Sequence, residues 1–400
     1  MPNHPTRDDI DLLEGSFYVD AKEPYAWMRA NAPVYFDPHT QIWGFASYDA
    51  VLAAEKDAKT FSNAQGARPV SPPLSMMIDM DDPEHWQRRK LVNKGFTPRR
   101  VRDSEDAIRD ACNEIIDAVC EKGECDFVRD IAAPLPMIMI GDMLGVAPED
   151  RGDLLRWSDD MVGALSGSAT QEQLERSMEA AMAYNNFCTH AVAARRSQPT
   201  DDLMSVLVHA EVDGDRLDDD GILHESLLIL VGGDETTRHV ISGGMEQLLL
   251  HPEQRQMLVD DPSRMETAVE EMLRWVSPIK TMCRTVTHDV EFRGQDLKQG
   301  QECLLLYESA NFDETKFDDP FTFDITRAPN EHVAFGFGAH YCLGQALARL
   351  ELEVMFERLM QRLPDIELTS DSASLPRREA NFITGLEAMP VKFTPTKPLA

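Results

Sequence analysis

Apolar side chains recur at intervals of three and four residues over most of this 400-residue chain, which is the spacing of amphipathic helices. Short alternating or continuous apolar runs of the kind that form strands are few. We therefore predict a mainly α protein with small β-sheets. The predicted helices span 24–31, 47–58, 84–94, 101–120, 172–196, 201–209, 217–250, 262–276 and 345–363, and the predicted strands span 34–36, 41–45, 286–292 and 302–307.

No part of this pattern divides the chain into separate units. The sequence has no Pro-, Gly- or Ser-rich linker and no internal repeat, so we expect one domain over residues 1–400. The segment from about residue 310 to 337 lacks periodicity. Irregular stretches of that length are uncommon unless they are functional, so we expect functional residues close to it.

The chain is strongly acidic, with a formal net charge of −31 and a pI of about 4.6. A field of that sign repels nucleic acid and anionic membranes, so neither is expected as a partner. The N-terminus lacks a basic segment followed by an apolar run, and no stretch approaches the roughly 20 apolar residues of a membrane helix. We predict a cytoplasmic protein that does not span a membrane.

One of the seven cysteines, Cys342, lies in the glycine-rich string FGFGAHYCLG at residues 335–344. Its glycines permit positive φ angles and a close approach of the backbone. A helix is predicted to begin directly after the string, and a thiolate near a helix N-terminus is stabilised by the helix dipole and by free N–H groups. A glycine turn that carries a buried structural thiol is the alternative reading.

The string FGFGAHYCLG resembles the haem-binding loop F-G-x-G-x-H-x-C-x-G of the cytochromes P-450, and the resemblance extends from about residue 24 to residue 393. It implies the cytochrome P-450 fold, with haem b between the long central helix and the helix after the cysteine loop. It also implies that the Cys342 thiolate is the iron ligand. The implied activity is that of a monooxygenase, which uses O2 and receives electrons from NAD(P)H through a reductase and a ferredoxin.

Glu271 and Arg274 form a Glu-x-x-Arg sequence, whose spacing places both side chains on one helix face. Glu270 could also reach Arg274, four residues away. Alone, such a pair is usually a solvated surface feature. The family resemblance implies a buried structural pair that Arg327, from the irregular segment, holds in place.

Four residues match the positions that bind the haem propionates in the family: His85, Arg89, Arg284 and His340. His85 and Arg89 are one helical turn apart on one face. Two carboxylates in a partly dry site need cationic donors, which explains the residue types. Taken singly, each could instead be an ordinary surface or core residue.

Gly232 and Gly233 interrupt the middle of the longest predicted helix, at a cost of roughly 1–2 kcal/mol relative to alanine. A close helix crossing would explain them. The resemblance implies instead an oxygen-binding groove, in which Glu235 and Thr236 act as an acid–alcohol pair. Such a pair suits the delivery of protons to bound O2, because a carboxylate relays protons from solvent and a hydroxyl holds the hydrogen-bond network.

The strings MMIDMDDP, RRKLVNKGFT, CDFVRDIAAPLPM, GGDETTRH and ESANFDE resemble the steroid side-chain hydroxylases of sterol-catabolising bacteria. This closer resemblance implies oxidation of the terminal methyl carbon (C26 or C27) of cholesterol or cholest-4-en-3-one. Another apolar substrate, such as a fatty acid or a terpenoid, is one alternative. A haem peroxygenase or gas-binding protein is another, against which the intact Glu235–Thr236 pair argues. The expected substrate pocket comprises Met76, Met77, Ile78, Gly232, Ile279, Met282 and Phe382.

Residues 88–102 carry seven cationic side chains and no acidic one, which is a local inversion of the chain's net charge. A solvated helix face is the ordinary explanation of such a run. The functional alternative is a docking surface for an acidic ferredoxin on the proximal side of the haem.

Overall fold

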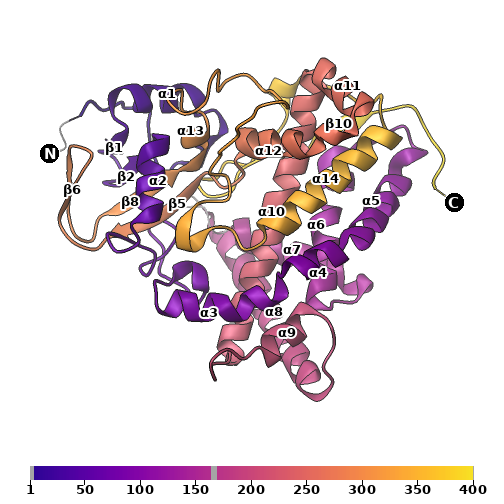
Figure 1. Ribbon diagram of the computed structural model, residues 1–400, viewed down its shortest axis with the longest axis horizontal. Coiled ribbons are helices and arrows are strands. Elements are labelled where there is room, and N and C mark those ends of the chain that lie inside the picture. The colour runs from indigo at the N-terminus through magenta and orange to yellow at the C-terminus, as the bar shows by residue number, and fades with distance from the viewer. Residues whose placement is uncertain (1–3, 164–168, 400) are drawn as a thin grey trace.

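The structure is a computed structural model that describes residues 4–163 and 169–399. Helices make up most of the fold, and most strands gather at one end, on the left in Figure 1. The long helix α10 (Asp219–Leu250) runs through the middle of the molecule and packs against α12 (Met265–Val276) and α14 (Gln345–Arg362). The predicted mainly α architecture with small sheets is confirmed.

The structure contains helices that the periodicity did not reveal, and α6 (Pro134–Leu144) shows why. Pro134 and Pro136 lie in its first turn, where the N–H groups have no helical partner and proline is tolerated. Elsewhere, the helix predicted over 101–120 is two helices that meet at Ser104. The other helices are α1 (Lys22–Asn31), α2 (Tyr48–Lys56), α3 (Glu84–Val92), α4 (Pro98–Asp103), α5 (Glu105–Cys120), α7 (Arg151–Gly163), α8 (Gln171–Ser197), α9 (Leu203–His209), α11 (Pro252–Asp260) and α13 (Tyr307–Asn311).

Within the described ranges, the largest sheet has the strand order β1-β2-β8-β5-β3, with β2 and β8 parallel and the other neighbours antiparallel. The prediction of one strand over 286–292 is wrong. Strand β5 ends at Val286, and β6 begins only at Val290. Buried residues on both faces hide the alternation of β5. The strands are β1 (Val34–Phe36), β2 (Trp43–Phe45), β3 (Phe61–Ser62), β4 (Glu124–Asp126), β5 (Thr281–Val286), β6 (Val290–Phe292), β7 (Gln295–Leu297), β8 (Glu302–Leu306), β9 (Glu367–Leu368) and β10 (Pro390–Lys392).

The largest apolar core lies between α5, α10, α12 and α14 and includes Ile116, Met245, Met272 and Phe356. This core fixes α10 relative to α14, the helix that follows the cysteine loop. Among the described residues, no helix has both the length and the apolarity needed to cross a membrane.

Candidate active site

The cysteine loop is a tight backbone turn at the start of α14. Gly336 and Gly338 have φ angles of 67° and 73°, in the left-handed region that favours glycine. A Cβ atom at Gly338 would lie 2.6 Å from the backbone oxygen of Glu55. The Cys342 N–H donates to the Phe335 carbonyl at 2.9 Å, which closes the loop. The glycines are therefore needed for both conformation and space.

The surroundings of the Cys342 sulfur suit a metal-bound thiolate. Burial raises the pKa of the free thiol, while the backbone N–H groups of Gly344 and Gln345 and the nearby Arg89 and Arg349 act in the opposite direction. A bound metal ion deprotonates a coordinating thiol. The donors around Cys342 are therefore arranged to stabilise the thiolate once iron is present.

The four predicted propionate-binding residues come together from three distant parts of the chain. The His85 and His340 rings lie 4.1 Å apart between centroids. Burial, followed by the positive charges of Arg284, His85 and Arg89, lowers the pKa of His340 to about 2. The buried Nε2 of His85 has no hydrogen-bond partner among the described residues. Two arginines beside two histidines, one of which has an unused ring nitrogen, fit an anionic ligand, as the two haem carboxylates would be.

Arg284 also has a protein partner that the sequence did not reveal. Its guanidinium donates to a Glu55 carboxylate oxygen at 3.0 Å, and the Tyr307 hydroxyl donates to the other oxygen. All three side chains are buried. The sequence feature that could have indicated this partner is Glu55 itself, a charged residue on the buried face of α2.

The structure explains the presence of glycine at positions 232 and 233 in two different ways. A Cβ atom at Gly233 would lie 2.6 Å from the Ile140 side chain, so this glycine permits the close crossing of α10 and α6. A Cβ atom at Gly232 would have no neighbour within 4 Å in the described parts of the chain. The Thr236 hydroxyl donates to the Gly232 carbonyl at 2.8 Å. Gly232 and Thr236 thus share one open side of α10, as an oxygen-binding groove requires.

Glu235 is fully buried and is held by cationic groups. Its two carboxylate oxygens accept from Arg238 at 2.5 Å and from Arg378 at 2.6 Å, and His239 Nε2 lies 3.5 Å away. Burial would raise the pKa of Glu235, but His239, Arg238 and Arg378 together hold that pKa well below its usual range. Glu235 is therefore ionised at neutral pH.

A partly exposed acid on α7 connects this cluster to solvent. Asp159 lies 3.1 Å from Arg238, and its side chain is 42% exposed. Burial raises the pKa of Asp159 to about 6, with the nearby Glu235 acting in the same direction. Asp234 is fully buried, and burial raises its pKa to about 8. Sequence reasoning missed Asp159 and Arg378, although Arg238 follows Glu235 at a recognisable pairing distance.

The structure brings together only some of the predicted pocket residues. Ile279, Met282 and Phe382 lie in one apolar cluster with Val162 of α7 and Val231 of α10. Met77 belongs to a different apolar cluster, and Met76 and Ile78 are its chain neighbours. The first cluster reaches α10 next to Gly232, which places it beside the open side of that helix.

The Glu-x-x-Arg pair on α12 is buried, as the sequence predicted. Arg274 donates to both Glu271 oxygens at 2.7 and 2.8 Å, and Arg327 reaches Glu271 at 3.1 Å. The alternative prediction that Glu270 pairs with Arg274 is wrong. Glu270 pairs instead with Arg349 at 2.6 Å and with His332 at 3.1 Å.

Several cations of the segment 88–102 have local partners, which partly agrees with the solvated-face explanation. Lys90 lies 2.9 Å from Asp213, and Lys94 donates to the Glu211 carbonyl. The side chain of Arg99 stays 85% exposed although it lies 3.4 Å from Asp103.

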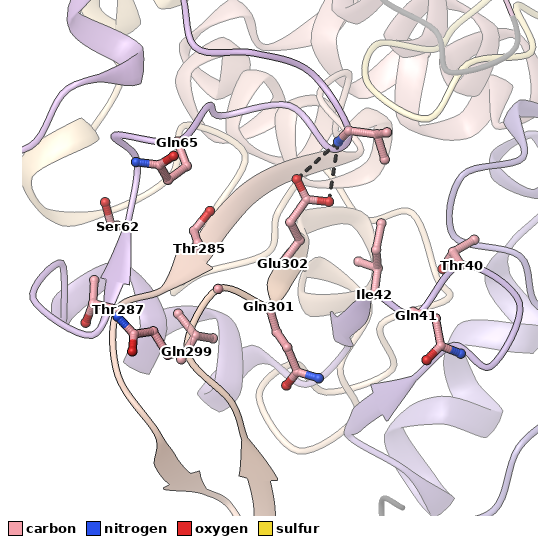
Figure 2. A pocket seen from close by; sticks show the side chains of 13 residues that line it. Thr40, Gln41, Ile42, Ser62, Gln65, Thr285, Thr287, Gln299, Gln301 and Glu302 are labelled. Carbon is pink, nitrogen blue, oxygen red and sulfur yellow. Dashed lines mark hydrogen bonds between the residues drawn. The ribbon is translucent and has the colours of Figure 1, made fainter.

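Figure 2 shows a separate open hollow of about 840 Å³ on the largest sheet. Thr285 lines it, whereas its neighbour Arg284 contacts Glu55, because side chains alternate between the two faces of a strand. Glu302 accepts the Val70 N–H at 3.1 Å at its rim. Most of the residues that line it have polar side chains, and, among the residues that the structure describes, the lining includes none of the candidate site residues.

Three features are those of a haem-thiolate oxygenase: a cysteine loop at a helix start, two arginines and two histidines beside that loop, and an open helix face whose threonine follows a buried glutamate. A family model described as "Cytochrome P450" matches residues 164–384, more than half of the chain. The chain belongs to the cytochrome P-450 family, whose members hold haem iron through a cysteine thiolate and use O2. The prediction of a haem monooxygenase is confirmed.

Individual relatives extend this result. A steroid C26-monooxygenase of Mycobacterium tuberculosis is 57% identical over 393 residues, which cover 98% of both chains. A methyl-branched lipid omega-hydroxylase of Mycobacterium bovis is 35% identical and covers 96% of this chain and 92% of that protein. The crystal structure of CYP109E1 from Bacillus megaterium in complex with testosterone has a TM-score of 0.85 at 32% identity, covering 94% of this chain and 99% of that one.

Proposed function

We propose that this protein hydroxylates the terminal methyl carbon (C26 or C27) of a steroid side chain, with cholest-4-en-3-one or cholesterol as substrate. The same carbon would then be oxidised further to the carboxylic acid. The observation that carries the proposal is the 57% identity, over 98% of both chains, to a steroid C26-monooxygenase. The apolar cluster of Ile279, Met282 and Phe382 beside α10 supports it, because a sterol needs a large apolar pocket.

Haem bound through a thiolate activates O2 for insertion of one oxygen atom into a C–H bond. The role of the protein is to hold that group, to shape the pocket and to deliver protons. Cys342 would supply the thiolate. The side chains that would hold the propionates are the arginines Arg89 and Arg284 and the histidines His85 and His340.

Glu235 and Thr236 would deliver protons on the distal side of the haem. The Thr236 hydroxyl faces the open side of α10 and donates to the Gly232 carbonyl, so its lone pairs remain available as acceptors. Glu235 accepts a proton from the solvent side, where Asp159 and Arg238 lie. Release of one guanidinium from Glu235 would let its carboxyl turn toward Thr236.

Binding and product analysis test the substrate. Titration of the haem-loaded protein with cholest-4-en-3-one should shift the Soret band to shorter wavelength if the sterol enters the pocket beside the haem. Turnover should give a product oxidised at C26 or C27. A methyl-branched fatty acid, run in parallel, separates the sterol proposal from a lipid omega-hydroxylase. Ring hydroxylation with an intact side chain would contradict the substrate while leaving the class of enzyme unchanged.

The axial ligand has its own test. Cys342→Ser should abolish the reduced-CO band that is characteristic of thiolate ligation. Cys125→Ser is the matched control, because Cys125 is also a free cysteine but lies in β4. A normal thiolate band in Cys342→Ser would refute the assignment.

The electrons would come from NAD(P)H through a reductase and a ferredoxin that docks on the segment 88–102. Helix α4 contacts α14, the helix that follows the cysteine loop, and carries the exposed Arg99 and Arg100. Electrostatic docking mainly sets the association rate and weakens with salt. Charge reversal at Arg99 and Arg100 should slow reduction by ferredoxin severalfold at low salt without changing sterol affinity. If the rate of reduction depended on neither the charge reversal nor the ionic strength, the segment 88–102 would be better explained as an ordinary solvated helix face.

A further inference from the structure

The segment 74–79, which includes Met76, Met77 and Ile78, is held from one side by a buried carboxylate. Asp79 accepts the N–H groups of Ala67 at 2.8 Å and Leu74 at 2.7 Å. Arg68 lies 3.5 Å from the same carboxylate. Asp79 thus fixes the loop that leads into this segment.

A second buried carboxylate holds the same segment from α10. Glu225 accepts the Met77 N–H at 2.8 Å, and Arg88 of α3 lies 3.4 Å from the same carboxylate oxygen. Arg88 also donates to the Ser75 carbonyl at 3.1 Å. The peptide chain between Ser75 and Met77 is therefore clamped between α3 and α10.

The side chain of Glu225 is fully buried, which makes this clamp costly. Burial raises the pKa of Glu225 to about 7, while the Met77 N–H and Arg88 lower it. Its second oxygen has no hydrogen-bond partner among the described residues. A leucine of similar volume would avoid these costs, so a carboxylate here indicates a role beyond packing.

The same clamp connects the two sides of the site. Arg89, the residue after Arg88, donates to the Tyr341 carbonyl in the cysteine loop. Helix α3 therefore contacts the cysteine loop through Arg89 and the segment around Met77 through Arg88. Glu225 completes this connection from α10, eleven residues before Thr236.

We propose that Glu225 is a positioning residue that fixes the backbone of Met76 and Met77 and so determines which carbon of the substrate reaches the iron. The inference rests on the proposed function, since it takes these residues as a wall of the substrate pocket. Glu225 itself does not need to touch the substrate. Its loss should broaden regioselectivity while the haem site stays intact.

The test compares Glu225→Gln and Glu225→Leu in the haem-loaded protein. Glutamine keeps an acceptor for the Met77 N–H but loses the charge that faces Arg88, and leucine removes both. Asp219→Asn is the matched control, because Asp219 lies on the same helix and pairs with Arg196 on the surface. If Glu225→Leu does not fold, Glu225→Gln alone provides the test of the proposal.

Hydrogen exchange of the amides in 74–79 should accelerate about tenfold in Glu225→Leu, the equivalent of one lost hydrogen bond, and less in Glu225→Gln. Products should shift from the terminal carbon toward internal side-chain carbons in the same order, with an unchanged reduced-CO band. Unchanged exchange and product ratios in the folded variants would overturn the inference. Failure of the proposed function would appear instead in the wild type, which would give no terminal product, while the exchange measurement would still report on the clamp.

Discussion

Within residues 4–163 and 169–399, two buried Glu-x-x-Arg pairs have identical spacing, one on α10 and one on α12. Glu235 and Arg238 lie 2.5 Å apart, and Glu271 and Arg274 lie 2.7 Å apart. Both glutamates are fully buried. The two pairs differ in what surrounds them.

The α12 pair is saturated by fixed groups. The Glu271 oxygens also accept from the Asp324 N–H at 3.0 Å, from Arg327 at 3.1 Å and from the Asn330 amide at 3.1 Å. Arg274 Nη1 also donates to the backbone carbonyls of Asn311 and Pro320. This network fixes the segment that leads to the cysteine loop.

The α10 pair lies among groups that are not saturated. Both carboxylate oxygens of Asp234, the Nδ1 of His239 and the Nε of Arg238 are buried without a hydrogen-bond partner in the described part of the chain. Among the described residues, His239 Nε2 has only the 3.5 Å contact with Glu235. Asp159 reaches the pair from a partly exposed position. Unsatisfied groups in a low-dielectric site are costly, and they are retained where charge or protons must move.

The same local sequence therefore serves two purposes. Saturation makes Glu271 and Arg274 part of the framework, and unsaturated surroundings leave Glu235 free to change its partners. Replacing each glutamate should show this difference as a loss of folding in one case and a loss of turnover in the other.

The largest effect is expected for Glu271→Gln. The substitution leaves Arg274 buried without its counter-charge, which costs about 3–5 kcal/mol of unfolding free energy. Urea unfolding and haem incorporation measure this loss. Glu266→Gln is the control on the exposed side of the same helix. If Glu271→Gln were as stable as the wild type, the conclusion that the α12 pair is structural and the α10 pair is not would be contradicted.

Glu235→Gln should instead leave a folded, haem-binding protein that turns over about 100-fold more slowly, the usual size of one acid–base contribution. Arg238 keeps Asp159 as a partner, so the fold loses less than at Glu271. Product formation at saturating sterol measures the effect. Glu235→Asp, which restores a carboxylate, should recover part of the rate. A thermal unfolding temperature that fell as far as in Glu271→Gln would contradict this prediction.

Thr236→Ala should bind sterol normally but lower the yield of product per NAD(P)H consumed by about tenfold, because the hydroxyl beside Gly232 is lost. The missing yield should be found as peroxide and water. Thr236→Ser, which retains a hydroxyl, is the matched control. Wild-type coupling in Thr236→Ala would separate Thr236 from proton delivery.

Much of this site could be predicted because its signals are local in sequence. The cysteine loop, both glycines of α10 and the Glu271–Arg274 spacing each lie within ten residues. Glu55, by contrast, is 229 positions from Arg284, and Arg378 is 143 positions from Glu235. Helical periodicity contains no information about residues that are far apart in sequence, so these contacts could be identified only from the structure.

The fold was predictable to a similar extent. The predicted span of helix α10, 217–250, differs from the observed one only at the first two positions. Helix α6 begins in a proline-containing segment, and α7 has a mostly polar sequence, so neither was predicted. Tertiary packing against α10 compensates for their weak local signals.

The smallest expected effect concerns pH and the solvent end of the unsaturated cluster. Burial raises the pKa of Asp159 to about 6, so its carboxyl is protonated below that pH and can donate a proton toward Glu235. As the pH rises through about 6, this donor is lost, and coupled turnover in the wild type should decline. Asp159→Asn should lower turnover severalfold below pH 6, have little effect at pH 8 and remove the inflection between them. Asp160→Asn is the matched control, because the neighbouring Asp160 pairs with Arg176 instead. If Asp159→Asn kept the wild-type pH profile, protons would reach Glu235 by another route, and the exposed end of this cluster would be only structural.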